Sequence, residues 1–171
     1  LQQLCALHRE KFNIPIVGIT GSNGKTIIKE WLYELLHADK HIARSPKSYN
    51  SQVGVPLSVW EITDDHDIAI LEAGISQPGE MDKLFNMIRP TIGVFTNIGQ
   101  AHNEGFASQQ EKVREKLRLF KSVGLLIYCK DYKFIDDEVN AYIKKGELDS
   151  SAVFTWSEKK DAQLQIIDIK T

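Results

Sequence analysis

The sequence has only two cysteines and no long run of apolar residues. Cys5 and Cys129 stand far apart and form no metal-binding or redox motif, so both are interpreted as small buried apolar residues. Two lone thiols are typical of a reducing compartment, so we expect a cytoplasmic protein. No apolar stretch approaches the roughly 20 residues that a membrane-spanning helix needs. These absences argue against a disulfide scaffold, a zinc-binding module and a membrane protein.

An excess of basic residues is also missing. The chain has 21 Lys and Arg against 23 Asp and Glu, which leaves no broad positive surface for nucleic acid. Its 171 residues, 42% of them hydrophobic, suit one globular domain. Leu1–Glu10 resembles the end of a helix, and the strand-like Gln163–Ile169 has nothing after it. We therefore expect residues 1–171 to be a single domain excised from a longer protein.

Apolar strand patterns alternate with helical ones along the chain. Strands are predicted at Ile14–Thr20, His41–Arg44, Asp67–Ala73, Thr91–Thr96, Leu125–Cys129, Ala152–Trp156 and Leu164–Ile169. Helices are predicted at Lys25–Ala38, Gly79–Ile88, Gln109–Lys121 and Asp136–Lys145, the third opened by a capping box at Ser108–Glu111. This alternation predicts an α/β fold of P-loop mononucleotide-binding type, with a mostly parallel sheet and helices on both faces.

A glycine-rich turn joins the first predicted strand to the first predicted helix. Its residues are Gly21, Ser22, Asn23, Gly24, Lys25 and Thr26. Glycines let backbone N–H groups converge on phosphate oxygens, and the helix N-terminus adds the positive end of its dipole. Lys25 would neutralise phosphate charge and the Thr26 hydroxyl would bind Mg²⁺. The standard phosphate loop has glycine where this chain has Ile19, so a purely structural turn is the alternative.

In parallel sheets, ligands bind beyond the carboxyl ends of the strands. Glu72 stands at the end of the third predicted strand, where a carboxylate would hold Mg²⁺; the alternative is a helix or loop cap. Asn97 and His102 follow the fourth strand in a polar turn. A lone histidine is more often structural or exposed than a ligand, so position alone leaves His102 open between these roles.

Lys116 lies within the apolar stripe of a predicted helix. Its stem would be buried and its ammonium would reach water, which sequence physics favours. The alternative is a buried lysine with a lowered pKa, whose neutral amine would take up CO₂ and become an anionic metal ligand. The segment from Asn50 and Ser51 to Pro56 is equally open between a substrate-binding loop and a turn that starts a helix.

Together these segments resemble the central ATPase domain of the Mur ligases, which build the peptide of bacterial peptidoglycan with ATP. The resemblance rests on the glycine-rich turn with Thr20, on Tyr49–Pro56, on Glu72, on Thr96–His102 and on Lys116. It covers about residues 14–120. Within the family, Glu72–Met81 most resembles the members that add D-alanyl-D-alanine to a UDP-N-acetylmuramoyl-tripeptide.

The resemblance implies a reaction through an acyl phosphate and a role for each motif. Lys25, Asn97 and the turn would bind ATP, and Asn50 and Ser51 would face the UDP-muramoyl peptide. Thr26 and Glu72 would hold one Mg²⁺, and Glu72, His102 and a carbamylated Lys116 would be associated with a second. This role for Lys116 reverses the preference for an exposed ammonium. Catalysis would depend on Lys25, Glu72, His102 and Lys116.

The resemblance is incomplete in two ways. The family's Asn-Asn is Asn50-Ser51 here, and the residues after Lys116 are Leu117-Arg118 in place of the common Ala-Glu. The family's N-terminal UDP-binding domain and C-terminal domain have no counterpart in the sequence, so we expect residues 1–171 alone to be inactive as a ligase. The alternatives are another Mur-type ligase, another P-loop kinase or NTPase, and a non-catalytic nucleotide-binding module; a GTPase would show guanine-binding motifs that the sequence lacks.

Overall fold

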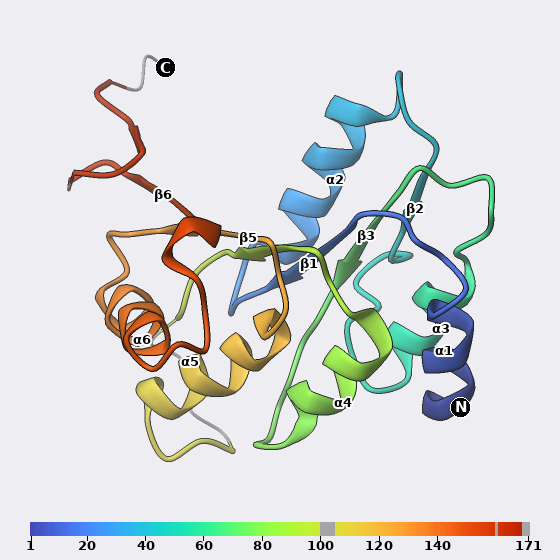
Figure 1. The fold of residues 1–171 in the computed structure, drawn as a ribbon, viewed down its shortest axis with the longest axis horizontal. Coiled ribbons are helices and arrows are strands. Elements are labelled where there is room, and N and C mark those ends of the chain that lie inside the picture. Colours follow the sequence, from blue (N-terminus) through green and yellow to red (C-terminus); the bar gives the residue numbers. More distant parts are fainter. Residues whose placement is uncertain (100–104, 160, 169–171) are drawn as a thin grey trace.

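The fold is built around a seven-stranded sheet in which every neighbouring pair of strands is parallel. The computed structural model describes residues 1–99, 105–159 and 161–168 (Figure 1). Along the sheet the strand order is β2-β3-β1-β4-β5-β6-β7. The strands are β1 (Ile16–Thr20), β2 (Ile42–Arg44), β3 (Ile68–Glu72), β4 (Ile92–Phe95), β5 (Leu125–Cys129), β6 (Val153–Ser157) and β7 (Leu164–Gln165).

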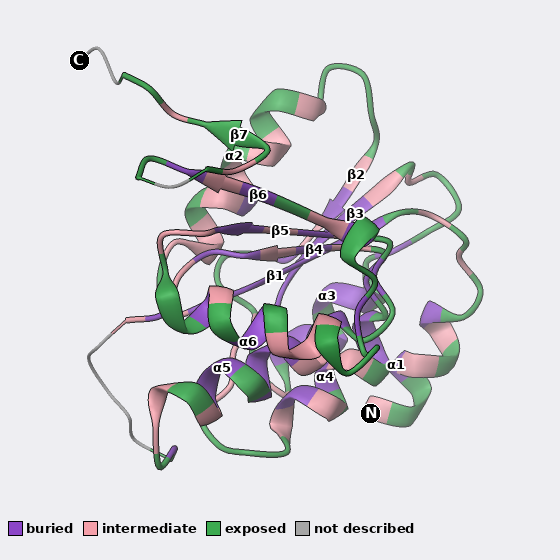
Figure 2. Ribbon diagram, turned by 60° about the vertical axis from the view of Figure 1, so that its left-hand side comes forward, coloured by how far each residue is buried: buried purple, intermediate pink, exposed green. Residues whose placement is uncertain are grey.

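Helices cover both faces of the sheet. One face carries α2, and the other carries α1, α3, α4, α5 and α6 (Figures 1 and 2). Their bounds are α1 (Gln2–Arg9), α2 (Lys25–Leu36), α3 (Gly54–Trp60), α4 (Glu80–Ile88), α5 (Gln109–Leu117) and α6 (Lys133–Lys144). Short 3₁₀ turns lie at Arg118–Phe120 and Ser150–Ala152. The expected α/β architecture is confirmed.

The core follows from the alternation of side chains along the central strand. All five residues of β1 are buried. Ile16 belongs to the larger apolar cluster, while Val17 and Ile19 belong to a smaller one, against which Ile28 and Leu32 of α2 pack. Successive side chains of a strand point to opposite faces, so β1 contributes to both clusters and needs cover on both sides.

The predicted elements occur, with differences at their ends and one omission. The final strand is shorter than predicted, because β7 covers only Leu164–Gln165. The helix predicted to run to Lys121 ends at Leu117 and continues as the 3₁₀ turn. The α3 helix is the omission; it occupies the segment after Ser51 that the sequence left open between a loop and a helix start.

The predicted capping box at the start of α5 is present in a modified form. The Ser108 hydroxyl accepts a hydrogen bond from the Glu111 amide at 3.1 Å. The Glu111 carboxylate accepts from the Ala107 amide at 2.6 Å, one residue earlier than in the usual box. Within the described part of the chain, no helix is long and apolar enough to cross a membrane.

Candidate functional site

The end of β4 holds the glycine-rich turn in place. The Ser22 amide donates to the Asn97 carbonyl at 2.9 Å, and the Asn23 amide donates to Asn97 Oδ1 at 3.1 Å. Thr96 Oγ1 donates to the Asn23 carbonyl at 2.6 Å. A Cβ atom on Gly21, whose φ is +144°, would lie 1.9 Å from Thr96 Oγ1. The close approach of the two segments therefore requires glycine at position 21.

The length of β1 explains why this chain has Ile19 where the standard phosphate loop has glycine. Ile19 is fully buried within β1, in the apolar cluster beneath α2. The strand continues to Thr20, so the turn begins at Gly21, the residue after the end of the strand. Gly24, with a φ of 80°, then forms the N-cap of α2. The sequence prediction of a strand, a turn and a helix is confirmed at this point.

Lys25 is the first residue of α2, and its side chain folds back over the turn. Its ammonium donates to the Gly21 carbonyl at 2.9 Å and to the Ser22 carbonyl at 3.3 Å. Burial lowers the pKa of Lys25; the Glu72 carboxylate opposes this effect, and the charge of Lys112 adds to it. Both acceptors are neutral carbonyl groups. The oxygens of an anionic ligand could take their place as acceptors and would form stronger, charge-assisted hydrogen bonds with the Lys25 ammonium.

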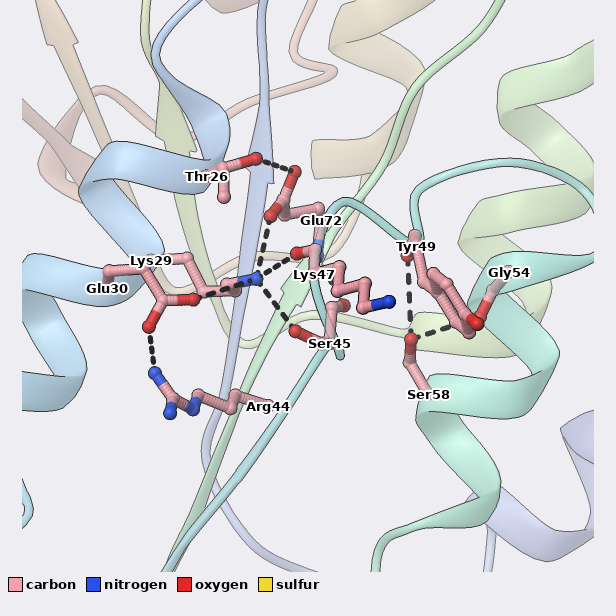
Figure 3. Close-up of polar contacts among 10 residues, drawn as sticks. All are labelled: Thr26, Lys29, Glu30, Arg44, Ser45, Lys47, Tyr49, Gly54, Ser58 and Glu72. Atoms are coloured by element: carbon pink, nitrogen blue, oxygen red, sulfur yellow. Dashed lines mark hydrogen bonds and ion pairs between the residues drawn. The ribbon is translucent and has the colours of Figure 1, made fainter.

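Glu72 lies at the carboxyl end of β3 and is fully buried. Its Oε2 atom accepts a hydrogen bond from the Thr26 hydroxyl at 3.1 Å, and its Oε1 atom lies 3.1 Å from the Lys29 ammonium (Figure 3). The second contact is an ion pair without hydrogen-bond geometry, so Oε1 accepts no hydrogen bond among the described residues. The predicted neighbours Thr26 and Glu72 are therefore brought together.

Lys116 reaches the same turn from α5. It is 2% exposed, and its ammonium donates to the Gly21 carbonyl at 3.2 Å. Burial, together with the charges of Lys25 and Lys112, lowers the pKa of Lys116 to about 7. The interpretation of Lys116 as a lysine whose ammonium extends into water is wrong, because its helix faces the interior at this end of the sheet.

These groups surround a cavity of about 600 Å³. Its walls come from the glycine-rich turn, the segments after β2, β3 and β4, the start of α4, and α5. The lining residues are Gly21, Ser22, Asn23, Lys25, Asn50, Ser51, Gln52, Val53, Gly74, Ile75, Ser76, Glu80, Gly99, Lys112 and Lys116. Thr26 and Glu72 are not among them. The cavity thus lies at the carboxyl ends of the strands, where the topology predicts a ligand.

The segment of Asn50 and Ser51 starts a helix, and its role in binding a substrate stays a prediction. Both line the cavity. The Ser51 hydroxyl also accepts from the Gly54 amide at 3.2 Å, and its carbonyl accepts from the Val55 amide at 2.9 Å, so the residue begins α3. The Asn50 carbonyl accepts from the Gly74 amide at 2.7 Å, which ties this segment to the one that follows β3.

Two lysines of the site were not predicted. Lys29, in α2, is fully buried, and Lys112 lines the cavity one helical turn before Lys116. Each had a sequence signal: Lys29 shares a helix stripe with Ile28 and Leu32, and Lys112 precedes Lys116 by four residues. His102 lies outside the described residues. Within residues 1–99, 105–159 and 161–168, no three His, Cys, Asp or Glu side chains form a cluster that would hold a metal by themselves.

Comparisons with known proteins agree with this geometry. A family model described as the Mur ligase middle domain matches residues 19–171. The UDP-N-acetylmuramoyl-tripeptide--D-alanyl-D-alanine ligase of Bacillus subtilis (strain 168) is 33% identical over 145 residues, which are 83% of this chain and 31% of that protein. The MurF crystal structure from Acinetobacter baumannii superposes with a TM-score of 0.81 at 25% identity, covering 92% of this chain and 34% of that one.

A second solved structure is that of the MurF ligase from Thermotoga maritima in complex with ADP. It has a TM-score of 0.79 at 26% identity and covers 93% of this chain and 36% of that one. The chain spans about a third of the length of the curated relatives that it matches.

Proposed function

Because the chain belongs to the Mur ligase family, as its middle domain, we propose that it is the ATPase domain of a ligase that joins D-alanyl-D-alanine to a UDP-N-acetylmuramoyl-tripeptide. One observation carries the proposal. Lys25 and Lys116 both donate to the Gly21 carbonyl in a cavity that Asn50 and Ser51 also line. A phosphate site and a candidate acceptor site therefore share one cavity.

The phosphate end of that cavity suits a nucleoside triphosphate. The N-terminus of α2, which begins after the N-cap Gly24, offers N–H groups, and Lys25 offers the charge that phosphates need. Asn97 acts indirectly, since it fixes Ser22 and Asn23 through its carbonyl and side-chain oxygens. ATP would bind with its phosphates along this turn. Lys25 would neutralise only part of the phosphate charge, and a divalent cation would neutralise more of it.

The residues at β3 fit Mg²⁺. Glu72 offers a buried carboxylate, and its Oε2 atom lies 3.1 Å from the Thr26 hydroxyl. Hard oxygen donors of this kind are what Mg²⁺ selects. A bound Mg²⁺ would offset charge on the transferring phosphoryl group. A second Mg²⁺ would be associated with Glu72, His102 and a carbamylated Lys116.

The burial of Lys116 supports its proposed carbamylation. With a pKa of about 7, a large fraction of its amine is neutral near pH 7. The neutral nitrogen would attack the carbon of CO₂ and lose a proton, leaving an N-carboxylate with one negative charge. This change would replace a third lysine charge near Lys25 and Lys112 with an anion, and so relieve the repulsion that lowers the pKa of Lys116.

The reaction would proceed in two transfers. An oxygen of the peptide carboxylate attacks the γ-phosphorus of ATP, the bond to the β–γ bridging oxygen breaks, and ADP leaves. Lys25 stabilises the charge that develops on the phosphoryl oxygens. The amine of D-alanyl-D-alanine then attacks the acyl carbon of the acyl phosphate, the bond from that carbon to the phosphate oxygen breaks, inorganic phosphate leaves, and the nitrogen loses a proton to give the amide. No nucleophilic side chain of the chain is needed for either transfer.

Residues 1–171 form, in this proposal, one Mur ligase central domain of a longer protein. The sites for uridine and for D-alanyl-D-alanine would come from an N-terminal and a C-terminal domain. We therefore expect residues 1–171, incubated with ATP, UDP-muramoyl-tripeptide and D-alanyl-D-alanine, to yield no pentapeptide product by mass spectrometry. Robust product from this piece alone would refute the division into domains.

Calorimetry with a non-hydrolysable ATP analogue and Mg²⁺ tests the nucleotide site in the complete protein. Lys25→Ala should weaken binding by roughly 1.5–3 kcal/mol, because it deletes a charge-assisted contact. The matched control is Lys40→Ala, which removes an exposed ammonium just beyond the end of α2 and should bind as the wild type does. Equal affinity in Lys25→Ala and the wild type would overturn the assignment.

A further inference from the structure

Lys29 is a fully buried lysine with a crowded ammonium. The group donates to the Ser45 carbonyl at 2.7 Å and to the Lys47 carbonyl through a short contact. It also lies 3.1 Å from Glu72 Oε1 and 3.1 Å from Glu30 Oε1 (Figure 3). Burying a charged ammonium is costly unless it is paired and hydrogen-bonded. The fold meets that cost with acceptors from three separate segments.

Those segments are connected to three of the walls of the cavity. Lys29 belongs to α2, which begins at the glycine-rich turn. Ser45 and Lys47 belong to the segment that follows β2 and continues to Asn50 and Ser51. Glu72 ends β3, and its amide donates to the Ser45 hydroxyl at 3.1 Å. The Lys29 ammonium therefore links the helix that follows the glycine-rich turn, the segment that leads to Asn50 and Ser51, and the candidate metal ligand Glu72.

The contacts also divide the two oxygens of Glu72 between two neighbours. Oε1 faces the Lys29 ammonium, and Oε2 faces the Thr26 hydroxyl (Figure 3). A free carboxylate rotates about its last bond and can offer a cation either one oxygen or both. Here rotation would move Oε1 away from the ammonium, so the pair fixes which oxygen is presented on the Thr26 side.

We propose that Lys29 is a positioning residue of the metal site: it holds Oε1 of Glu72, leaves Oε2 beside Thr26 for the divalent cation, and anchors the segment leading to Asn50. This inference rests on the proposed function, since it assumes that Thr26 and Glu72 bind a cation. Lys29 itself contacts neither the nucleotide nor the acceptor in this scheme.

The test measures Mn²⁺ affinity of the ADP complex of the complete protein by electron paramagnetic resonance, which counts free Mn²⁺. Lys29→Met removes the ammonium while keeping the length and apolar stem. It should weaken Mn²⁺ binding by roughly 10- to 100-fold, as is typical when a group that orients a metal ligand is lost. Binding of ADP in EDTA should change less than about threefold, since the phosphate turn keeps its own contacts.

Two further variants separate the possible failures. Thr26→Val deletes the proposed hydroxyl ligand, and Lys40→Met removes an exposed ammonium next to α2. If Thr26→Val and Lys29→Met both match the wild type, the metal site of the proposed function is wrong and the inference is wrong with it. If Thr26→Val weakens Mn²⁺ binding and Lys29→Met does not, the positioning role is wrong while the proposed function stands.

Lys29→Arg keeps the test decisive should Lys29→Met fail to fold. Arginine retains the charge opposite Glu72, but its planar fork cannot reproduce the geometry of an ammonium. It should therefore fold and still bind Mn²⁺ at least about fivefold more weakly. A merely structural lysine would give variants with lower Tm whose folded fraction binds Mn²⁺ as the wild type does, and that result would overturn the proposal.

Discussion

Two helices of the domain each bury a lysine at the carboxyl edge of the sheet, and the two ammonium groups have opposite surroundings. Lys29 of α2 meets two carboxylates and two carbonyls. Lys116 of α5 meets one carbonyl, at Gly21, and its pKa is lowered to about 7 by burial and by the charges of Lys25 and Lys112.

The comparison shows that burial alone does not decide what a lysine does. A buried ammonium surrounded by acceptors is held as a cation and organises the groups around it. A buried ammonium surrounded by other cations loses its proton readily and becomes a reactive amine. In our proposal the site needs both kinds, because the same small region has to orient one metal ligand and to generate another.

The largest effect on stability should come from Lys29. Lys29→Met should lower the free energy of unfolding by roughly 3–5 kcal/mol, since it leaves Glu72 as an uncompensated buried charge. Urea denaturation measures this, with Lys40→Met as a control expected within about 0.5 kcal/mol of the wild type. The double variant Lys29→Met with Glu72→Gln should recover part of the loss. A double variant less stable than Lys29→Met would refute the pairing.

The largest effect of Lys116 should be on activity. In the complete ligase, Lys116→Ala should reduce product formation by roughly 10²–10³-fold, the size typical of losing one electrostatic stabiliser. Acetate should partly restore activity, because it supplies the carboxylate that the carbamate would provide. Lys116→Arg should stay inactive, since it keeps the charge and cannot become an anion. Product is followed by mass spectrometry, and an Arg variant as active as the wild type would exclude the carbamate.

The lowered pKa of Lys116 also predicts that the free energy of unfolding depends on pH in CO₂-free buffer. The pKa of Lys116 is lowered from 10.5 to about 7 by folding, so between these values the unfolded chain binds the extra proton. Stability therefore rises with pH in this window, and the penalty is full below pH 7. Between pH 7 and 9 the wild type should gain about 2 kcal/mol relative to Lys116→Met. Parallel stability curves for the two proteins would contradict the lowered pKa.

The smallest effect should come from the outer partner of Lys29. The Glu30 side chain is 43% exposed and is shared with Arg44, whereas Glu72 is fully buried. Glu30→Gln should cost less than about 1 kcal/mol in urea denaturation, because exposed ion pairs contribute little. Its ADP complex should bind Mn²⁺ within about twofold of the wild type. A loss as large as that of Lys29→Met would place the essential pair at Glu30 instead.

Much of the fold and part of the site could be predicted from local patterns. The order of strands and helices, the turn at Gly21–Thr26 and the position of Glu72 all follow from periodicity and the strand-end rule. The early end of β7 and the decision for a helix at α3 could not be predicted, since both segments have brief and weakly periodic patterns. His102 was predicted in the polar turn after β4, lies outside the described residues, and stays a prediction.

Lys29 and Lys116 show what the sequence alone determined and what only the tertiary structure decided. Helical spacing places Lys29 and Lys116 among apolar residues, and that much is local. Whether each ammonium meets carboxylates or other cations depends on which strand ends lie opposite it, and this follows from the order β3-β1-β4 in the sheet. Electrostatic energy depends on distance in space and on burial, neither of which is a property of sequence spacing, so only the folded chain could assign the two lysines different roles.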